Sequence, residues 1–179
     1  MSDNGVYLGN PNLKKANTPI EFTQEQVLEF MKCKDDPVYF ANNYIKIVSL
    51  DEGLTQFHPY HFQEKLITNF HENRFNICKM PRQTGKSTTV VSYLLHYAVF
   101  NDSVNIGILA NKAATARELL SRLQTAYENL PKWMQQGIIS WNKGSLELEN
   151  GSKILAASTS ASAVRGMSFN ILFLDEFAF

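Results

Sequence analysis

The stretch of residues 79–89, KMPRQTGKSTT, contains the end of a phosphate-binding pattern. Gly85-Lys86-Ser87 matches the last three positions of G-x-x-x-x-G-K-[ST], a loop whose backbone N–H groups surround phosphates. In such a loop Lys86 reaches the β and γ phosphates, and the Ser87 hydroxyl is a ligand of Mg²⁺. Three common residues can also stand together by chance, so this interpretation needs support from the rest of the chain.

Met80 occupies the position where the pattern has its first glycine. That glycine permits a tight turn, so a methionine there requires the loop to start with an ordinary φ angle. We expect residues 83–87 to build the cradle for the β-phosphate, because they follow Met80 and lead into a helix. The substitution therefore changes the start of the loop and leaves the cradle in place.

Two carboxylates follow an apolar run near the end of the chain. Ile171-Leu-Phe-Leu174 precedes Asp175 and Glu176, which predicts a buried strand whose acids emerge at the carboxyl edge of a sheet. There Asp175 can hold Mg²⁺ through its water shell, and Glu176 can orient and deprotonate an attacking water. A solvated strand end is the alternative for the acids alone. With the loop about 90 residues upstream on a strand of its own, the pattern favours a phosphate-loop ATPase that uses ATP and Mg²⁺.

Two further side chains are candidates for contact with the nucleotide. Arg165 lies in a polar stretch of small residues just before the acidic strand, where a guanidinium could stabilise charge developing on the γ-phosphate. An ion pair with a surface carboxylate is the alternative for Arg165. Gln63 has an amide that can both donate and accept hydrogen bonds at the edge of adenine. A glutamine on a helix surface commonly has no such role, and both interpretations stay open.

The elements that must position these residues follow from local patterns. Capping signals and helical spacing predict helices that begin near Thr23 and Asp36 and that cover residues 61–70, 87–100 and 112–130. Helical spacing puts apolar residues on one face of the first helix and on one face of the third, where we expect Phe62 to pack in the core. We expect the second helix to carry Phe40, Ala41 and Tyr44 inward. The residues of the first and third faces are Val27, Leu28, Phe30, Met31, Phe62, Leu66 and Phe70.

Short apolar runs predict buried strands at residues 75–78, 104–110 and 171–174. Asn150-Gly151 predicts the turn of a hairpin within residues 146–155. Strands that alternate with helices predict an α/β fold with a mostly parallel sheet flanked by helices.

Composition limits the remaining possibilities. Lysine plus arginine and aspartate plus glutamate number 17 each, so bulk charge gives no general attraction for nucleic acid. Cys33 and Cys78 stand far apart, and we expect both to be reduced and near the core. The composition of residues 1–20 predicts a flexible arm, and we expect residues 21–179 to form one domain. No apolar run is long enough to span a bilayer and no signal peptide is present, so we expect a cytosolic protein without a membrane partner.

Four segments together resemble the N-terminal ATPase of tailed-phage large terminases, most closely those of the T4-like branch. The similarity runs from about residue 20 to the last residue. In that family an arginine commonly precedes the Gln-x-Gly-Lys core and the first glycine is commonly absent, so Arg82 and Met80 fit. The four segments are PRQTGKST at 81–88, DPVYFANNYI at 36–45, AVRGMSF at 163–169 and LDEFA at 174–178.

The resemblance implies a P-loop NTPase fold of the RecA/ASCE type and a motor that drives double-stranded viral DNA into a procapsid by ATP hydrolysis. The motor would work in the host cytoplasm as a homo-oligomeric ring, docked on the portal protein with a small terminase subunit. Carried over by position, Lys86 and Ser87 would bind phosphate and Mg²⁺, Asp175 would be the metal-linked acid and Glu176 the catalytic base. Arg165 would act on a neighbouring subunit. The loop residues that would surround the phosphates are Arg82, Gln83, Thr84, Gly85, Lys86, Ser87 and Thr88.

The sequence also departs from that family. It ends three residues after Glu176, before the strand that carries the family's ATP-coupling motif and before the nuclease domain. We therefore expect an incomplete ATPase domain, truncated after the acidic strand, that hydrolyses little ATP alone. Two alternatives are a fragment of a superfamily 2 helicase or translocase and a non-catalytic phage interaction module. Nucleotide binding separates the interaction module from the two ATPases.

Overall fold

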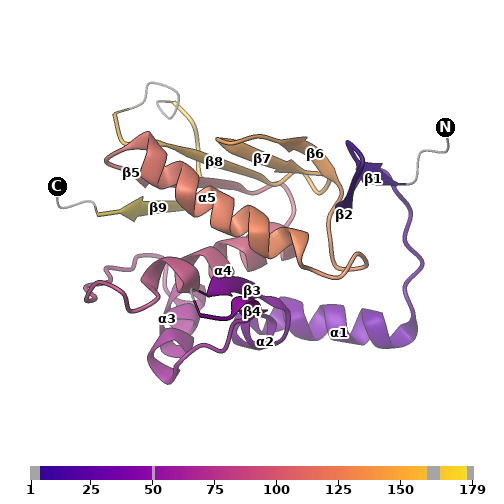
Figure 1. Cartoon of the computed structure of the whole chain (residues 1–179), viewed down its shortest axis with the longest axis horizontal. Helices are drawn as coiled ribbons and strands as arrows, with labels where there is room; N and C mark the ends of the chain where they lie inside the picture. Colours follow the sequence, from indigo (N-terminus) through magenta and orange to yellow (C-terminus); the bar gives the residue numbers. More distant parts are fainter. Residues whose placement is uncertain (1–4, 50, 161–165, 177–179) are drawn as a thin grey trace.

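The structure, a computed structural model, describes residues 5–49, 51–160 and 166–176. Figure 1 shows the main sheet with α5 across it in the upper part of the view, and α1 to α4 in the lower part. The helices of the described part are α1 (Gln24–Asp35), α2 (Pro37–Tyr44), α3 (His61–Glu72), α4 (Lys86–Phe100) and α5 (Ala113–Glu128). The strands are β1 (Val6–Tyr7), β2 (Asn10–Lys14), β3 (Lys46–Ser49), β4 (Gly53–Gln56), β5 (Asn105–Ala110), β6 (Ile138–Trp141), β7 (Ser145–Leu148), β8 (Lys153–Ser158) and β9 (Ile171–Asp175).

The main sheet is mixed, which corrects the prediction of a mostly parallel sheet. Its strand order is β6-β7-β8-β5-β9; β8, β5 and β9 run parallel, whereas β6-β7 and β7-β8 are antiparallel. The antiparallel half arises because a hairpin turn joins β7 to β8, with Gly151 at a φ of 83° as the Asn150-Gly151 pair predicted. α5 packs against β5 and β8. The α/β class is therefore confirmed, and the strand directions are not.

Helix α4 is the central element of the core. Eleven of its fifteen residues are buried, because the run from Val90 to Phe100 is apolar on nearly every side. Within it His96 is 2% exposed, and its Nε2 lies 2.8 Å from the carbonyl oxygen of Cys33 in α1. Burial lowers the pKa of His96 to about 4, and the hydrogen bond to Cys33 opposes this shift only in part. The helix that carries the phosphate-binding pattern is therefore fixed by packing along its length.

The predicted helix starts are confirmed in atomic detail. At α1 the Thr23 hydroxyl accepts a hydrogen bond from the backbone N–H of Gln26, and the Gln26 side chain accepts one from the N–H of Thr23, which is a complete capping box. At α2 the Asp36 carboxylate accepts hydrogen bonds from two backbone amides of the first turn.

The apolar faces of α1 and α3 are only partly buried, and the expected burial of Phe62 is wrong. Leu28 of α1 is 66% exposed, and Phe62 of α3 is 46% exposed. In α3 the buried positions are Gln63 and Ile67. Periodicity locates an apolar stripe, but it does not say whether a neighbour covers that stripe. In α1 the exposed stripe also includes Val27 and Met31, each at 48%.

The N-terminal residues that the structure describes, which belong to the arm predicted over residues 1–20, contact distant parts of the chain. β1 and β2 form an antiparallel pair, and Leu13 is 2% exposed. The Lys14 ammonium lies 2.7 Å from a carboxylate oxygen of Glu149, and the Lys14 N–H donates to the Gln135 side chain at 3.0 Å. Residues distant in sequence therefore hold this segment, which a local composition signal cannot reveal.

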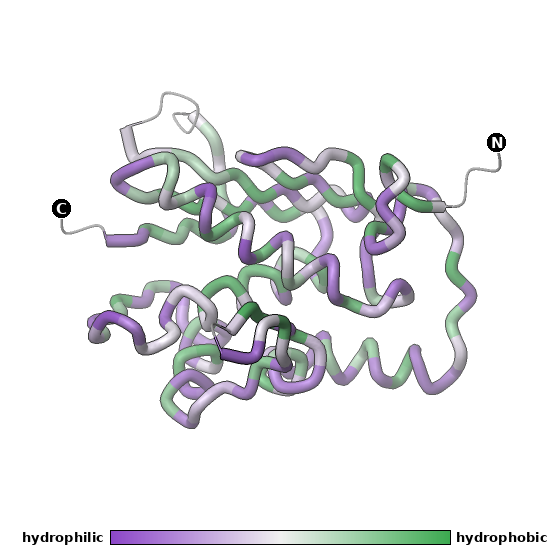
Figure 2. The backbone as a smooth tube through the Cα atoms, viewed as in Figure 1, coloured by the Kyte–Doolittle hydropathy of each residue, from purple (hydrophilic) through white to green (hydrophobic). Residues whose placement is uncertain are grey.

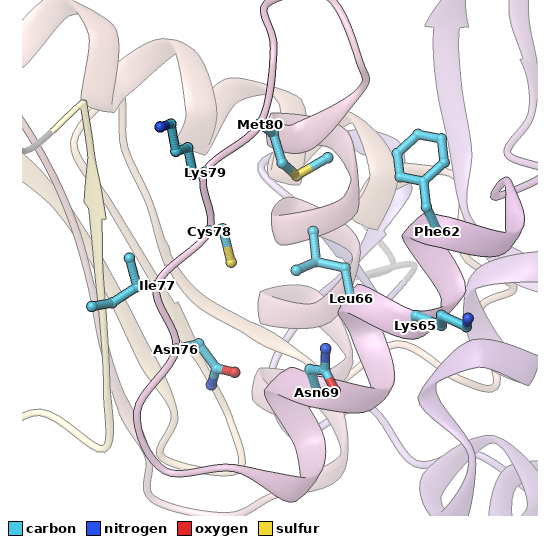
Figure 3. A pocket seen from close by; sticks show the side chains of 9 residues that line it. All are labelled: Phe62, Lys65, Leu66, Asn69, Asn76, Ile77, Cys78, Lys79 and Met80. Atoms are coloured by element: carbon cyan, nitrogen blue, oxygen red, sulfur yellow. The ribbon is translucent and has the colours of Figure 1, made fainter.

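Residues 75–78 do not form the predicted buried strand. Figure 3 shows Cys78 and Met80 directed toward α3 while Ile77 and Lys79 point away from it, which is the alternation of extended backbone. Yet Phe75 is 83% exposed and Ile77 fully exposed, and within the described residues this segment joins no sheet. Extended backbone becomes a strand only when a neighbour satisfies its hydrogen bonds. Similarly, β9 forms as predicted but Leu172 is 48% exposed, so the strand is only partly buried.

Three strand regions have no counterpart in the prediction: the β1-β2 hairpin, the β3-β4 hairpin and β6. In the described part of the chain, the helices are all too short or too polar to cross a membrane.

Candidate nucleotide site

The loop before α4 has the backbone geometry that an anion site requires. Gly85 is the N-cap of α4 at a φ of 74°, and Gln83 also has a positive φ, of 62°. Met80 is not among the positive-φ residues, which confirms the ordinary start of the loop. The first amides of α4 have no partner within the helix and carry its positive dipole end. Free amides at the start of a helix favour an anion.

Two threonine hydroxyls donate hydrogen bonds to backbone carbonyls of the loop. Thr84 Oγ1 donates to the carbonyl of Pro81 at 3.0 Å, and Thr89 Oγ1 donates to the carbonyl of Gly85 at 3.0 Å. The Thr89 bond is the i to i−4 bond that threonine makes in a helix, so the sequence could have indicated it. The phosphate-binding pattern predicts Thr84 only as a loop residue and predicts no role for Thr89.

Lys86 and Asp175 meet across the site. The Lys86 ammonium lies 3.0 Å from Oδ1 of Asp175, whose residue is 7% exposed. β9 delivers this carboxylate to the edge of the sheet, because the parallel register pairs Asp175 with Ala110 at the end of β5. In Figure 2 the tube of β9 is hydrophobic along the strand and turns hydrophilic at its end. The structure thus brings together the two motifs that the sequence places 89 positions apart.

The same carboxylate is suited to a divalent cation. Asp175 Oδ1 is buried and receives no hydrogen bond of good geometry in the described part of the chain, so the Lys86 ammonium is its ionic partner. Ser87, in the first turn of α4, supplies a hydroxyl beside Lys86. Within the described residues no three His, Cys, Asp or Glu side chains gather as a metal cluster. Mg²⁺ commonly takes one or two carboxylates together with waters and phosphate oxygens.

The other predicted site residues are placed as follows. Glu176 is exposed next to Asp175 and has a φ of 50°, a left-handed conformation that a non-glycine residue rarely adopts. Arg82 and Gln83 are exposed, and Thr88 is half-buried in α4. Arg165 lies outside the described residues. The roles assigned to all of these residues remain predictions.

Gln63 is adjacent to the loop and is engaged with backbone at both ends of its amide. It is 3% exposed; its Nε2 donates to the carbonyl of Thr84 at 3.1 Å, and its Oε1 accepts from the N–H of Tyr60 at 2.8 Å. Each end of the amide makes one hydrogen bond to backbone, and the predicted contact between Gln63 and adenine stays a prediction. The contact with Thr84 was not predicted.

A groove of about 310 Å³ lies beside the start of the loop, between α3 and residues 76–80. Figure 3 shows Phe62 and Leu66 on one wall, and Cys78 and Met80 on the other. Partial burial raises the pKa of the Cys78 thiol, and the charge of Lys86 opposes the shift. The groove opens next to the phosphate loop but contains neither Lys86 nor Asp175. Its complete lining is Phe62, Lys65, Leu66, Asn69, Asn76, Ile77, Cys78, Lys79 and Met80.

Comparison with known proteins assigns this arrangement to a family. The family model described as "Terminase large subunit, T4likevirus-type, N-terminal" matches residues 77–179, which is more than half of the chain. The chain belongs to this large terminase family. The matched region contains the phosphate loop, α4 and β9, and with them Lys86 and Asp175.

A solved structure shows the same fold. The chain is similar to the crystal structure of the HK97 bacteriophage large terminase, with a TM-score of 0.64 and 17% sequence identity over 79% of this chain. At that identity the likeness concerns the fold alone, and it supports an α/β fold of the large terminase kind. The alignment covers 30% of the HK97 chain, so this terminase chain spans less than a third of the length of that relative.

Proposed function

We propose that this chain binds ATP with Mg²⁺ at the loop before α4 and belongs to the ATPase part of a motor that packages double-stranded viral DNA. The observation that carries the proposal is the contact between Lys86 and Asp175. It places the cation that would bind phosphate and the carboxylate that would bind metal at one point, at the N-terminus of a buried helix.

The ion pair between Lys86 and Asp175 suggests how both side chains change partners when nucleotide binds. Without nucleotide, Lys86 and Asp175 neutralise each other at 3.0 Å. Polyphosphate draws Lys86 toward its oxygens and leaves the Asp175 carboxylate available. Ser87 and Asp175 are the residues that would hold Mg²⁺, which neutralises phosphate charge when bound. Glu176 would then orient and deprotonate the attacking water, and Arg165 would stabilise charge on the γ-phosphate.

Family membership supports the packaging role. A large terminase motor acts on viral DNA as a ring of copies on the portal protein, in the host cytoplasm and with a small terminase subunit. For this chain each of these partners is part of the proposal. A superfamily 2 helicase would share the loop and the acidic strand end, but the family match lies with terminases.

The first experiment is a calorimetric titration with a slowly hydrolysed ATP analogue and Mg²⁺. We expect the wild-type chain to bind and Lys86→Ala to lose binding. Lys153→Ala is the matched control, because Lys153 also forms an ion pair, at 2.9 Å from Glu147, but lies in β8 away from the loop. A wild-type chain that is folded by circular dichroism and binds no nucleotide would contradict the proposal. Equal binding by Lys86→Ala and wild type would contradict it as well.

A further inference from the structure

The side chain of Gln63 links the start of α3 to the phosphate loop. A primary amide that is 97% removed from solvent must find partners for both of its polar ends, and both partners here are backbone groups. One end accepts from the N–H of Tyr60, the residue just before α3. The other end donates to the carbonyl of Thr84 across 21 positions of sequence.

The bond to Thr84 fixes the orientation of one peptide group in the loop. A trans peptide is planar, and its C=O and N–H point in opposite directions. When Gln63 holds the Thr84 oxygen on the α3 side, the N–H of Gly85 must point to the other side. Gly85 is the N-cap of α4, so this amide lies among the donors at the positive end of the helix.

The opposite orientation would damage an anion site. It would turn the Thr84 carbonyl oxygen toward the phosphates, where its partial negative charge repels them, and it would remove one N–H donor. Gly85 lacks a Cβ and has a positive φ, so the backbone at this peptide has the freedom to make such a turn. The hydrogen bond from the buried Gln63 amide to the Thr84 oxygen opposes this rotation of the peptide.

Space around Gly85 supports the same conclusion. A Cβ atom built on Gly85 would collide with Nε2 of Gln63, so the amide is seated directly against the loop backbone. Position 85 therefore requires glycine for two reasons: the backbone has a positive φ there, and the side chain of Gln63 leaves no room for a Cβ.

We infer that Gln63 is a positioning residue of the phosphate loop, which holds the Thr84–Gly85 peptide with its N–H directed to the phosphate site and thereby acts on any polyphosphate, whatever its base. The inference rests on the proposed function. The two roles of Gln63 affect different ligands. A contact with adenine would strengthen the binding of ATP alone, whereas positioning of the loop strengthens the binding of ATP, GTP and inorganic tripolyphosphate equally.

The binding test compares two methionine variants with the wild-type chain. Gln63→Met keeps the length of the side chain and removes both hydrogen bonds. Gln26→Met removes the matching hydrogen bond at α1, from the Thr23 N–H to the Gln26 side chain, and so controls for the loss of a helix-cap contact. We expect Gln63→Met to weaken binding of ATP, GTP and tripolyphosphate by the same factor, about tenfold for one hydrogen bond near a charged ligand. Gln26→Met should bind all three as wild type does.

Two results of that titration would overturn the inference. A loss confined to ATP would show that Gln63 reads the base. Unchanged binding of all three ligands by Gln63→Met would show that the loop holds its geometry without it.

A second measurement needs no ligand. Gly85 is the only one of the nine glycines that follows a threonine. Labelling the threonine carbonyl and the glycine nitrogen with isotopes therefore gives a single NMR signal, for the Thr84–Gly85 peptide. We expect this signal to shift or broaden in Gln63→Met and to stay in place in Gln26→Met; an unmoved signal in Gln63→Met refutes the positioning role. If the wild-type chain binds none of the three ligands, the proposed function fails, and this signal alone decides whether Gln63 sets the peptide.

Discussion

Replacing Lys86 should destabilise the nucleotide-free protein as well as remove phosphate binding. The substitution Lys86→Met keeps most of the aliphatic stem and deletes the charge, so the carboxylate of Asp175 loses its ionic partner. Two unit charges about 3 Å apart attract by roughly 5 kcal/mol at an effective dielectric constant near 20. The Lys86 side chain is 30% exposed and Asp175 has already lost hydration on burial, and both facts reduce the net value. We expect a loss of about 2 kcal/mol in the free energy of unfolding.

The assay is urea unfolding of a double-mutant cycle, followed by circular dichroism. Asp175→Asn should cost less than Lys86→Met, because the lysine can turn to solvent. The double variant should recover most of the loss, which gives a coupling energy of about 2 kcal/mol. Lys153→Met, which breaks the exposed pair with Glu147, should change stability by less than about 0.5 kcal/mol. If Lys86→Met unfolds at the same urea concentration as wild type, the electrostatic reasoning is refuted.

Two further predictions concern buried ionisable groups. Because the pKa of His96 is lowered to about 4, the unfolded chain binds a proton below pH 6.5 that the folded chain does not, and stability should fall by about 3 kcal/mol between pH 6.5 and pH 4. His96→Gln should flatten this part of the stability curve in urea titrations, and exposed His61→Gln should leave it unchanged. Burial acts to raise the pKa of Glu149, but hydrogen bonds from Lys14 and two backbone amides lower it overall, so its contribution is present at neutral pH and lost on acidification. Glu149→Gln should therefore speed tryptic cleavage at Lys14 at neutral pH, whereas Glu147→Gln should not; equal cleavage rates would show that Glu149 does not hold the N-terminal segment.

Local signals in the sequence predicted local structure well. The capping box of Thr23 and Gln26, the turn at Asn150-Gly151 and the long buried α4 all depend on residues within a few positions of each other. The phosphate loop and the acidic strand end were predicted for the same reason, since each is a short pattern with a fixed relation to one strand or helix.

Features that depend on distant partners were missed. The N-terminal hairpin is held by Gln135 and Glu149, and no composition signal near residue 10 reports on them. Residues 75–78 have the apolar character of a strand, but strand formation is decided by a neighbour. The bond from Gln63 to Thr84 likewise depends on how α3 lies against the loop. The amide makes Gln63 a candidate from the sequence alone, but the group that it contacts is decided by the fold.

The burial of α4 also divides the phosphate loop into two parts with different stiffness. From Thr89 onward most residues of α4 are buried in the core, whereas Pro81 to Gln83 are exposed. A ligand at the N-terminus of α4 thus meets donors that are already immobile, and association loses conformational entropy only at the outer part of the loop. The part of the loop next to α4 is therefore the more rigid, and Pro81 to Gln83 are the part that can adjust. Any shape change on binding should therefore be confined to the side of the loop that carries Arg82.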